Sequence, residues 1–406
     1  MICVVVVIVV VYPYVQELDV TSCKTPSSNI NATALFSNVS RPTALPLSSA
    51  LGSYRILSLP SDQVIIRAVY LDLRSREGFR NISVFMVEIT KTLLARKGGG
   101  IVACGTSDAV TKTLKIRVVL NIGWVHSNHP SLTHDMAMID CFGLPDTPTG
   151  ARAFLWYRVV DGGDLYRVES EQPYYIPTPR NTKNKTVVCM AVLYNTPPYL
   201  IEFLRYYKHL GVDHVYMVAD DSIVQTAALE TDGFVQEALR EGFVSFSFWH
   251  KWLTNKMIFY SSQMLAYENC IYRFQGTYEY ALLVDSDDHF IPRVQDQKKL
   301  DYYIERFCKV GACTFKWIEY FPDCGQDWSR LGPHGNVTNT ILSNRSQEFE
   351  YHTGKSLYKL SAALDAGIHT PLKLIKGYKC SKVPSNIAYV AHIRKHRAPP
   401  GGMKFC

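Results

Sequence analysis

The 406-residue chain has no Cys-X-X-Cys pair, and the spacing of Cys308 and Cys313 does not suit a zinc knuckle, so zinc binding by its cysteines is disfavoured. Charged residues make up only 19% of the chain. The basic residues are scattered, and the small cluster at 394–397 is typical of a solvated tail, which argues against nucleic-acid binding. With 47% hydrophobic residues, general disorder is excluded, and the length allows two domains.

The apolar run at residues 2–12 does not reach the roughly 20 residues that a membrane-spanning helix needs. Pro13 follows it, and no basic residue precedes it as in a signal sequence. Three interpretations stay open: a signal-peptide core, a short signal anchor, and the remnant of a longer anchor. A buried Val-rich strand is the structural alternative. We favour an anchor or its remnant within residues 1–16.

The eleven cysteines favour disulfide bonds and therefore an oxidising compartment, and their odd number leaves at least one unpaired or bonded to another chain. Six Asn-X-Ser/Thr glycosylation motifs agree with that compartment. They begin at Asn31, Asn38, Asn81, Asn184, Asn336 and Asn344. Together these features predict the lumen of the secretory pathway or the cell exterior.

The amino-acid composition and the spacing of apolar residues differ between segments of the chain. Residues 17–60 are rich in Ser, Thr, Asn and Pro, and this composition predicts a flexible stem. Strand-like runs at 63–73, 82–90, 113–120 and 153–160 predict a small β-rich domain over 61–180. Pro173, Pro177 and Pro179 indicate a linker after it.

Residues 185–400 have the alternating pattern of an α/β domain. The run 186–194 is almost continuously apolar, 197–210 has helical spacing that ends at Gly211, and 215–219 is a second apolar run. This is a β-α-β unit, so we expect a mostly parallel sheet. A helix at 261–274 and strands at 280–284 and 314–317 continue the pattern.

Two acidic clusters, Asp220-Asp221 and Asp285-Ser286-Asp287-Asp288, directly follow predicted strands. Ligands of open α/β sheets bind at the carboxyl ends of the strands, so this position predicts a site. In extended backbone Asp285 and Asp287 would point to the same side, and hard carboxylate oxygens suit Mg²⁺ or Mn²⁺. Such an ion offsets the charge of a nucleoside-diphosphate leaving group. An acidic turn that caps the next helix is the alternative interpretation.

Several segments resemble glycosyltransferase family 92, in the same order from about residue 185 to 395. They are VCMAVLYN (188–195), YLIEF (199–203), HLGVDHVYM (209–217), LVDSDDHFIP (283–292), FKW (315–317), IH (368–369) and AHIR (391–394). The resemblance implies a GT-A (Rossmann-like) fold after a small β-rich domain, an inverting mechanism, Mn²⁺ or Mg²⁺, and a UDP-sugar donor, with UDP-galactose expected. It also implies a type II Golgi membrane protein with a lumenal catalytic domain and a glycan acceptor. Two positions depart from the family pattern, since Asp288 replaces the usual Glu and His289 follows it.

Carried over by position, Asp285 and Asp287 would hold the metal, and His369 is either a late metal ligand or structural. For three further residues two interpretations stay open. Asp220 and Asp221 would face the uridine or cap a helix near Ile223. Lys355 would neutralise phosphates or be solvated. The base that deprotonates the acceptor would be Glu319 or Asp323.

The sequence therefore predicts a metal-dependent hexosyltransferase that is bound to the membrane by an N-terminal anchor and does not bind nucleic acid. A catalytically silent glycan-binding protein with the same fold is the alternative, and Asp288 and His289 are the features that favour it. A secreted structural glycoprotein is a third class, which the two acidic strand ends disfavour.

Overall fold

The computed structural model describes residues 56–58, 65–72, 82–90, 100–106, 109–112, 114–118, 134–144, 152–158, 165–170, 185–192, 197–219, 232–248, 259–294, 297, 299–321, 347–367, 369, 373–375 and 377–393. The predicted anchor, the asparagines of all six glycosylation motifs, Asp220, Asp221 and Asp323 lie outside these residues. Within the described ranges, no helix combines the length and apolarity needed to cross a bilayer.

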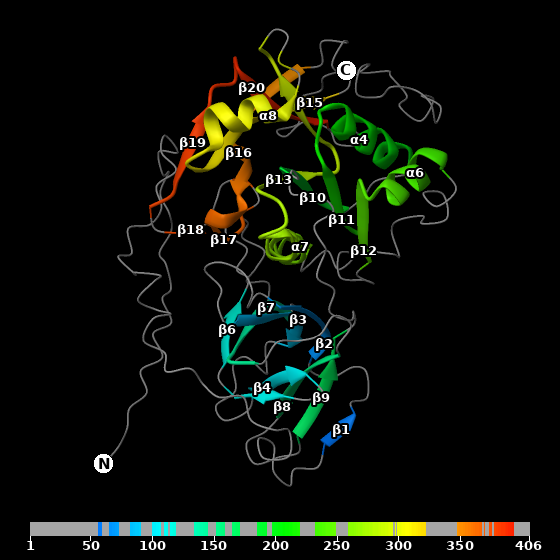
Figure 1. Cartoon of the computed structure of the whole chain (residues 1–406), viewed down its shortest axis with the longest axis vertical. Helices are drawn as coiled ribbons and strands as arrows, with labels where there is room; N and C mark the ends of the chain where they lie inside the picture. Colours follow the sequence, from blue (N-terminus) through cyan, green and yellow to red (C-terminus); the bar gives the residue numbers. More distant parts are fainter. Residues whose placement is uncertain are drawn as a thin grey trace, which may run out of the picture.

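The first part of the chain forms a β-sandwich (Figure 1). One sheet has the order β2-β3-β7-β6, from Ile65–Asp72, Ile82–Thr90, His134–Phe142 and Leu114–Val118. The other has the order β1-β9-β8-β4-β5, from Ile56–Ser58, Leu165–Glu169, Ala153–Arg158, Gly100–Thr106 and Val110–Thr111. Buried side chains of both sheets, including Phe85, Ile139 and Leu155, form the core between them, and the disulfide Cys104–Cys141 joins β4 to β7.

The strand predictions in this region are confirmed for β2, β3, β6 and β8. The predicted extent of the stem is wrong at its end. Ile56–Ser58 form strand β1, which pairs in parallel with Leu165–Glu169 of β9, although the composition around it is that of a linker. The cause is a tertiary pairing with a strand more than a hundred residues away, which local composition does not encode.

The second part begins with a parallel α/β arrangement. Its elements in chain order are β10 (Thr186–Val192), α4 (Pro197–His209), β11 (His214–Ala219), α6 (Gly233–Glu241), β12 (Val244–Phe248), α7 (Phe259–Phe274) and β13 (Tyr280–Asp285). The four strands lie in the order β12-β11-β10-β13 and pair in parallel, as predicted. This is the 3-2-1-4 order of the first four strands of dinucleotide-binding sheets.

The remaining strands extend this sheet to nine strands of mixed direction. They are β14 (Asp288–Pro292), β15 (Gly311–Phe321), β16 (Gln347–Lys359), β19 (Lys379–Val383) and β20 (Ala388–Ile393). Between them lie α8 (Leu300–Tyr303) with the π-helical turn Ile304–Cys308, the 3₁₀ turn Leu360–Ala362, and the small pair β17 (Ala363–Asp365) and β18 (Lys373–Leu374). The antiparallel pairings β13–β16, β15–β16 and β14–β20 make this half of the sheet mixed rather than parallel.

Helices cover both faces of this sheet because each has one apolar face. In α4, Leu200, Phe203, Leu204 and Tyr207 recur at helical spacing, and all are fully buried with residues of α6 and α8 on one face of the sheet. The predicted helix end at Gly211 is confirmed by its positive φ of 83°. Helix α7 covers the other face.

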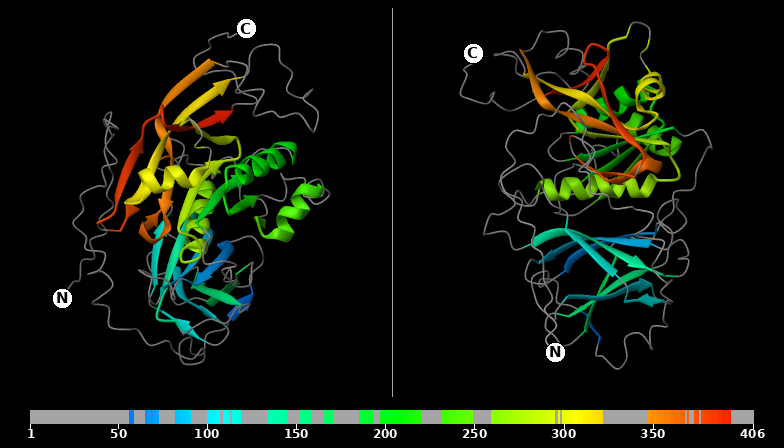
Figure 2. Two further views of the ribbon diagram at one scale, coloured as in Figure 1. Left: turned by 45° about the horizontal axis from the view of Figure 1, so that its top comes forward. Right: turned by 90° about the vertical axis from the view of Figure 1, so that its left-hand side faces the viewer.

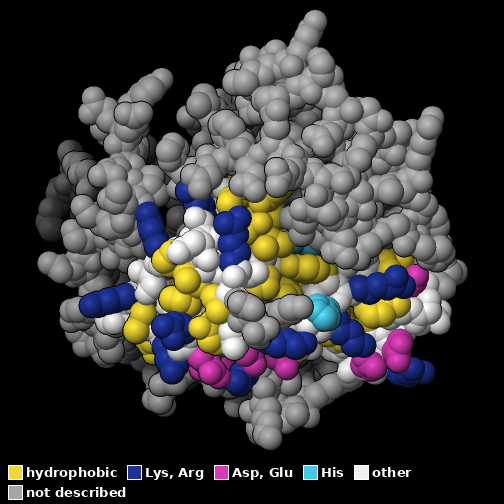
Figure 3. All heavy atoms as spheres, turned by 90° about the horizontal axis from the view of Figure 1, so that it is seen from above, with side chains coloured by type: hydrophobic (Ala, Val, Ile, Leu, Met, Phe, Trp, Pro, Cys, Tyr) yellow, Lys and Arg dark blue, Asp and Glu magenta, His cyan; other side chains and the backbone are white. Residues whose placement is uncertain are grey.

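Helix α7 lies between the nine-stranded sheet and the β-sandwich (Figure 2). Met138 of β7 is buried in the same apolar cluster as α7, and Phe142 packs against that cluster. The sandwich therefore supports α7 from the side opposite the sheet. On the described part of the face seen from above Figure 1, Lys and Arg side chains are spread among apolar ones, and Asp and Glu side chains lie mainly along the lower edge (Figure 3).

Candidate functional site

The acidic motif forms the connection between β13 and β14. Asp285 is the last residue of β13, Asp288 is the first of β14, and Ser286 and Asp287 form the turn between them. One carboxylate oxygen of Asp288 accepts a hydrogen bond from the backbone N–H of Asp285 at 2.8 Å. The prediction of extended backbone through this motif is therefore wrong, because the side chain of Asp288 closes a turn on the strand end.

Asp288 is fully buried, and its carboxylate accepts four hydrogen bonds. Its Oδ2 accepts from the Asp285 backbone and, at 2.9 Å, from the ammonium of Lys355. Its Oδ1 accepts from Trp317 Nε1 at 2.9 Å and lies 2.7 Å from His392 Nδ1. Burial by itself raises the pKa of this carboxyl, but Lys355 and His392 lower it more, so the net pKa lies well below its usual range. Asp288 is therefore ionised and its acceptor positions are filled.

Both carboxylate oxygens of Asp285 accept hydrogen bonds from neighbouring side chains. Its Oδ1 accepts hydrogen bonds from Gln263 and, at 2.7 Å, from the hydroxyl of Tyr267. Its Oδ2 accepts from Lys355 at 2.5 Å. Burial, followed by the negative charge of Asp285, raises the pKa of Tyr267 well above its ordinary value, so the phenol stays a donor.

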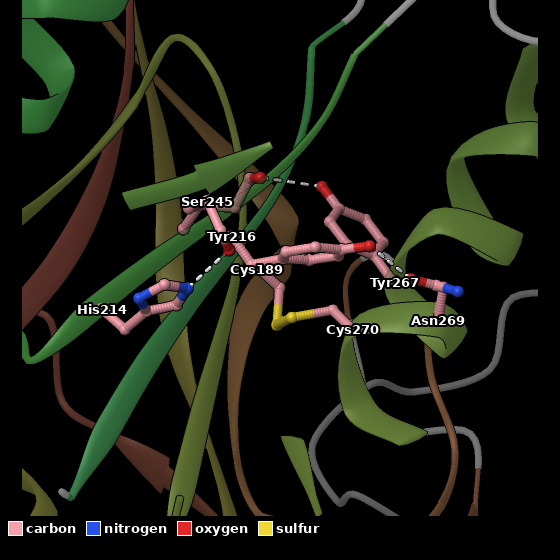
Figure 4. Close-up of a disulfide and its surroundings, with 8 residues drawn as sticks. Cys189, His214, Tyr216, Ser245, Tyr267, Asn269 and Cys270 are labelled. Carbon is pink, nitrogen blue, oxygen red and sulfur yellow. Dashed lines mark hydrogen bonds between the residues drawn. A yellow bond between two sulfur atoms is a disulfide. The ribbon is translucent and has the colours of Figure 1, made fainter. Parts of the chain in front are cut away.

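Helix α7 positions these donors through its spacing. Gln263 and Tyr267 are four residues apart and Cys270 is three further on, so all three lie on one face of the helix. Cys270 forms a disulfide with Cys189 of β10, which fixes this face against the sheet (Figure 4). Asn269 adds a further link, since its Oδ1 accepts a hydrogen bond from the hydroxyl of Tyr216 at 2.6 Å (Figure 4).

Lys355 lies on β16 with its side chain completely buried. Its ammonium contacts the carboxylates of Asp285 and Asp288 and lies 5.3 Å from the ring centre of Trp317. Burial lowers the pKa of Lys355, but the two carboxylates raise it more, so it stays charged. The expectation of a solvated Lys355 is therefore wrong. Its role towards phosphate stays a prediction, since in this structure it faces the two carboxylates.

His392 and Trp317, like Gln263 and Tyr267, belong to this network although the sequence did not predict their part in it. Strand β20 runs parallel to β15, and this pairing places Val390 beside Trp317 and His392 beside Glu319. The His392 ring lies 4.6 Å from that of Trp317, and its Nδ1 is 3.4 Å from Asp287 as well as close to Asp288. The signal available in the sequence was the AHIR segment at 391–394, in which this histidine stands.

The two other histidines considered from the sequence have different surroundings. His369 packs on Trp317 with ring centres 5.1 Å apart, and its Nδ1 is 3.3 Å from the carbonyl of Gly354. Burial, with a contribution from nearby Lys355, lowers the pKa of His369 to about 4, so it is neutral at neutral pH. His289 is buried and packs on Tyr206 of α4, as a structural histidine does.

The two candidate bases cannot be compared directly, since Asp323 lies outside the described residues. Glu319 lies on β15 beside His392 and is only 1% exposed. A base must reach the acceptor hydroxyl, so this burial disfavours direct contact between Glu319 and an acceptor. Its role as the base stays a prediction.

Four side chains have ligand atoms close enough to bind one metal ion. The atoms of Asp285, Asp287, Asp288 and His392 all lie within 4.8 Å of one another. His369 is not in this set, so its role as a ligand stays a prediction. Asp287 is the most open of the three carboxylates, with 26% of its side chain exposed. Carboxylate oxygens with one imidazole suit Mn²⁺ or Mg²⁺, so the residues present fit such an ion.

Asp285 and Asp288 differ in how many of their acceptor positions are already filled by hydrogen-bond donors. Asp288 has filled all four acceptor positions, and Asp285 has filled three of its four with donors from the described residues. Asp288 therefore holds the surrounding side chains in place, and the role of Asp285 and Asp287 as metal ligands stays a prediction.

Comparison with known proteins gives a family for the second part of the chain. The sequence model of glycosyltransferase family 92 matches residues 184–401, just over half of the chain. No curated protein matches the chain. Among solved structures, the apo form of the WbbM bifunctional glycosyltransferase is similar over 39% of this chain and 27% of its own, with 13% identity and a TM-score of 0.23.

Proposed function

Since the chain belongs to glycosyltransferase family 92 and is therefore a transferase, we propose that it transfers a hexose from a UDP-sugar to a glycan acceptor. We propose galactose as the hexose, inversion at the transferred carbon, and dependence on Mn²⁺ or Mg²⁺. The observation that carries this proposal is the cluster of Asp285, Asp287, Asp288 and His392 at the carboxyl end of β13. In open α/β sheets this is the edge at which nucleotides bind.

The fold part of the proposal is a GT-A-type domain. It is supported by the 3-2-1-4 order of the parallel strands β12-β11-β10-β13 and by helices on both faces of the sheet. In this arrangement β13 pairs with β10 on one side and with β16 on the other, so the motif follows an interior strand that is buried up to Val284. A rigid, buried support keeps the carboxylates within the narrow range of positions that ion binding needs.

The side chains of the site have distinct tasks in this proposal. Asp287 and Asp285 hold the ion, which when bound offsets the negative charge on the departing UDP. Gln263 and Tyr267 orient Asp285 through its Oδ1. Asp288 ties the strand end to β15, β16 and β20 through Trp317, Lys355 and His392. The acceptor's proton goes to a base, with Glu319 or Asp323 as the candidates from the sequence.

We also propose that the enzyme acts in the Golgi lumen and is held at the membrane by its N-terminal segment. The disulfides Cys104–Cys141, Cys189–Cys270 and Cys308–Cys313 fit an oxidising compartment. Microscopy of the full chain, with glycosidase digestion to detect N-glycans, tests this placement. A cytosolic, unglycosylated protein would contradict it.

The enzymatic proposal is tested by incubating the purified protein with a panel of UDP-sugars and glycan acceptors, with product detection by mass spectrometry. We expect transfer in Mn²⁺, its loss in EDTA, and its return when Mn²⁺ is added back. Galactose is expected to give the highest rate, and NMR of the product should show an inverted anomeric carbon.

Asp287→Ala is the matched site variant, and Glu237→Ala is its control. Glu237 lies on α6 with half its side chain exposed, so its loss should change neither fold nor rate. We expect Asp287→Ala to abolish transfer while the unfolding temperature stays close to that of the wild type. Full activity in Asp287→Ala would remove the metal site from the proposal. A protein that binds glycans but neither turns over any UDP-sugar nor binds UDP with Mn²⁺ would instead be the silent glycan-binding alternative.

A further inference from the structure

We propose that Lys355 is a built-in counter-cation of the acidic cluster that competes with the divalent ion for Asp285. This inference rests on the ion binding proposed above and adds to it a residue that sets the affinity. Lys355 enters the site from β16, seventy residues after Asp285, and no part of its side chain is exposed. Its ammonium is therefore a fixed part of the site rather than a mobile surface charge.

The contacts of the ammonium define where the competition occurs. It bridges Oδ2 of Asp285 at 2.5 Å and Oδ2 of Asp288 at 2.9 Å. Asp288 accepts from three further donors, and the other oxygen of Asp285 already accepts from Gln263 and Tyr267. The oxygen of Asp285 that an ion would use most readily is thus the one that Lys355 holds.

The charges give the direction of the effect. Asp285, Asp287 and Asp288 carry three negative charges and Lys355 one positive charge, so these side chains offer a divalent ion a net charge of −2. The ammonium opposes the ion in two ways, by occupying an acceptor position and by repulsion over a few ångströms in a buried site. Loss of the Lys355 ammonium should therefore tighten ion binding, although the ion-free protein also loses a favourable contact.

The experiment measures Mn²⁺ binding by calorimetry, with no donor or acceptor present, for the wild type, Lys355→Met and Lys359→Met. Methionine keeps the unbranched apolar stem of lysine and removes the charge. Lys359 lies on the same strand, is only partly buried, and pairs through the backbone with Tyr280 rather than with the acidic motif, so it controls for loss of any lysine. We expect the Kd for Mn²⁺ to fall at least about tenfold in Lys355→Met and to stay unchanged in Lys359→Met.

The same variants give a second readout in thermal unfolding. Because the dication replaces the missing ammonium, Mn²⁺ should raise the unfolding temperature more in Lys355→Met than in the wild type. If Lys355→Met does not fold without metal, refolding in saturating Mn²⁺ should restore the folded protein, and failure to do so overturns the proposal.

Equal or weaker Mn²⁺ binding by folded Lys355→Met also overturns it, because Lys355 would then act only as a scaffold for the carboxylates. This result is distinct from failure of the proposed function. If the proposed function fails, the wild type itself binds no Mn²⁺, or binds it and transfers no sugar.

Discussion

Asp288→Asn is the substitution that most directly tests the network described here. The wild-type carboxylate accepts from the Asp285 backbone, Lys355, Trp317 and His392, all at the buried end of β13. An asparagine of the same size offers one acceptor oxygen and one N–H₂ donor. Two of the four donors would then face another donor, and Lys355 would keep only the carboxylate of Asp285.

The magnitude follows from these losses. A hydrogen bond to a charged group contributes roughly 1.5–3 kcal/mol, and breaking one partner of a buried ion pair costs roughly 3–5 kcal/mol. These terms overlap because they concern the same carboxylate. We therefore expect Asp288→Asn to lower the free energy of unfolding by about 4 kcal/mol, a large part of the 5–15 kcal/mol typical of a domain.

The assay is urea unfolding followed by circular dichroism, with disulfides intact and EDTA present so that no ion contributes. Asp301→Asn is the matched control, since Asp301 also pairs with a lysine, Lys185, at 3.6 Å, but both side chains are over 40% exposed. We expect that control to lose less than about 1 kcal/mol. If Asp288→Asn loses no more free energy of unfolding than the Asp301→Asn control, the view that Asp288 organises the buried network is refuted.

Three further substitutions test other parts of the site. Tyr267→Phe removes a buried donor to Asp285 while keeping the ring, and should cost about 2 kcal/mol in the same urea assay, whereas no loss would mean that this bond is not formed. Replacing Cys189 and Cys270 together by Ala opens a link between residues 81 apart and should cost about 4 kcal/mol, with α7 losing protection from hydrogen exchange. A pKa of about 4 for His369 means that the unfolded chain binds a proton more readily, so stability should fall as the pH drops from 6.5 towards 4. We expect this residue to account for about 1–2 kcal/mol of the fall after allowance for partial exposure, and a His369→Gln variant with the same acid sensitivity as the wild type would contradict it.

Local patterns predicted much of the architecture. The strands β10, β11 and β13 were predictable because strands that are buried on both faces are apolar throughout. The helices α4 and α7 were predictable because apolar residues recur at helical spacing. The mixed direction of the sheet beyond β13 was not readable. It depends on antiparallel pairings such as β13 with β16, and pairing partners far apart in the chain leave no periodic signal in either strand.

The acidic motif was likewise predicted only in part. Its position after a buried strand and its neighbouring segments were sufficient to predict the family and a carboxylate-rich site. Its backbone was predicted wrongly, because the turn at Ser286 and Asp287 depends on Asp288 reaching back to the Asp285 backbone, and a run of four polar residues does not show which of them turns inward.

The sequence by itself therefore predicted the family, the α/β character of the chain from residue 185 and an acidic motif directly after a buried strand. Only the tertiary structure decided which side chains surround the carboxylates. Gln263, Trp317, Lys355 and His392 reach the motif from positions 22, 29, 70 and 104 residues away from the aspartates that they contact. The physical reason is that burial and strand pairing bring these groups together, and a buried carboxylate is stable only where donors from several strands converge on it.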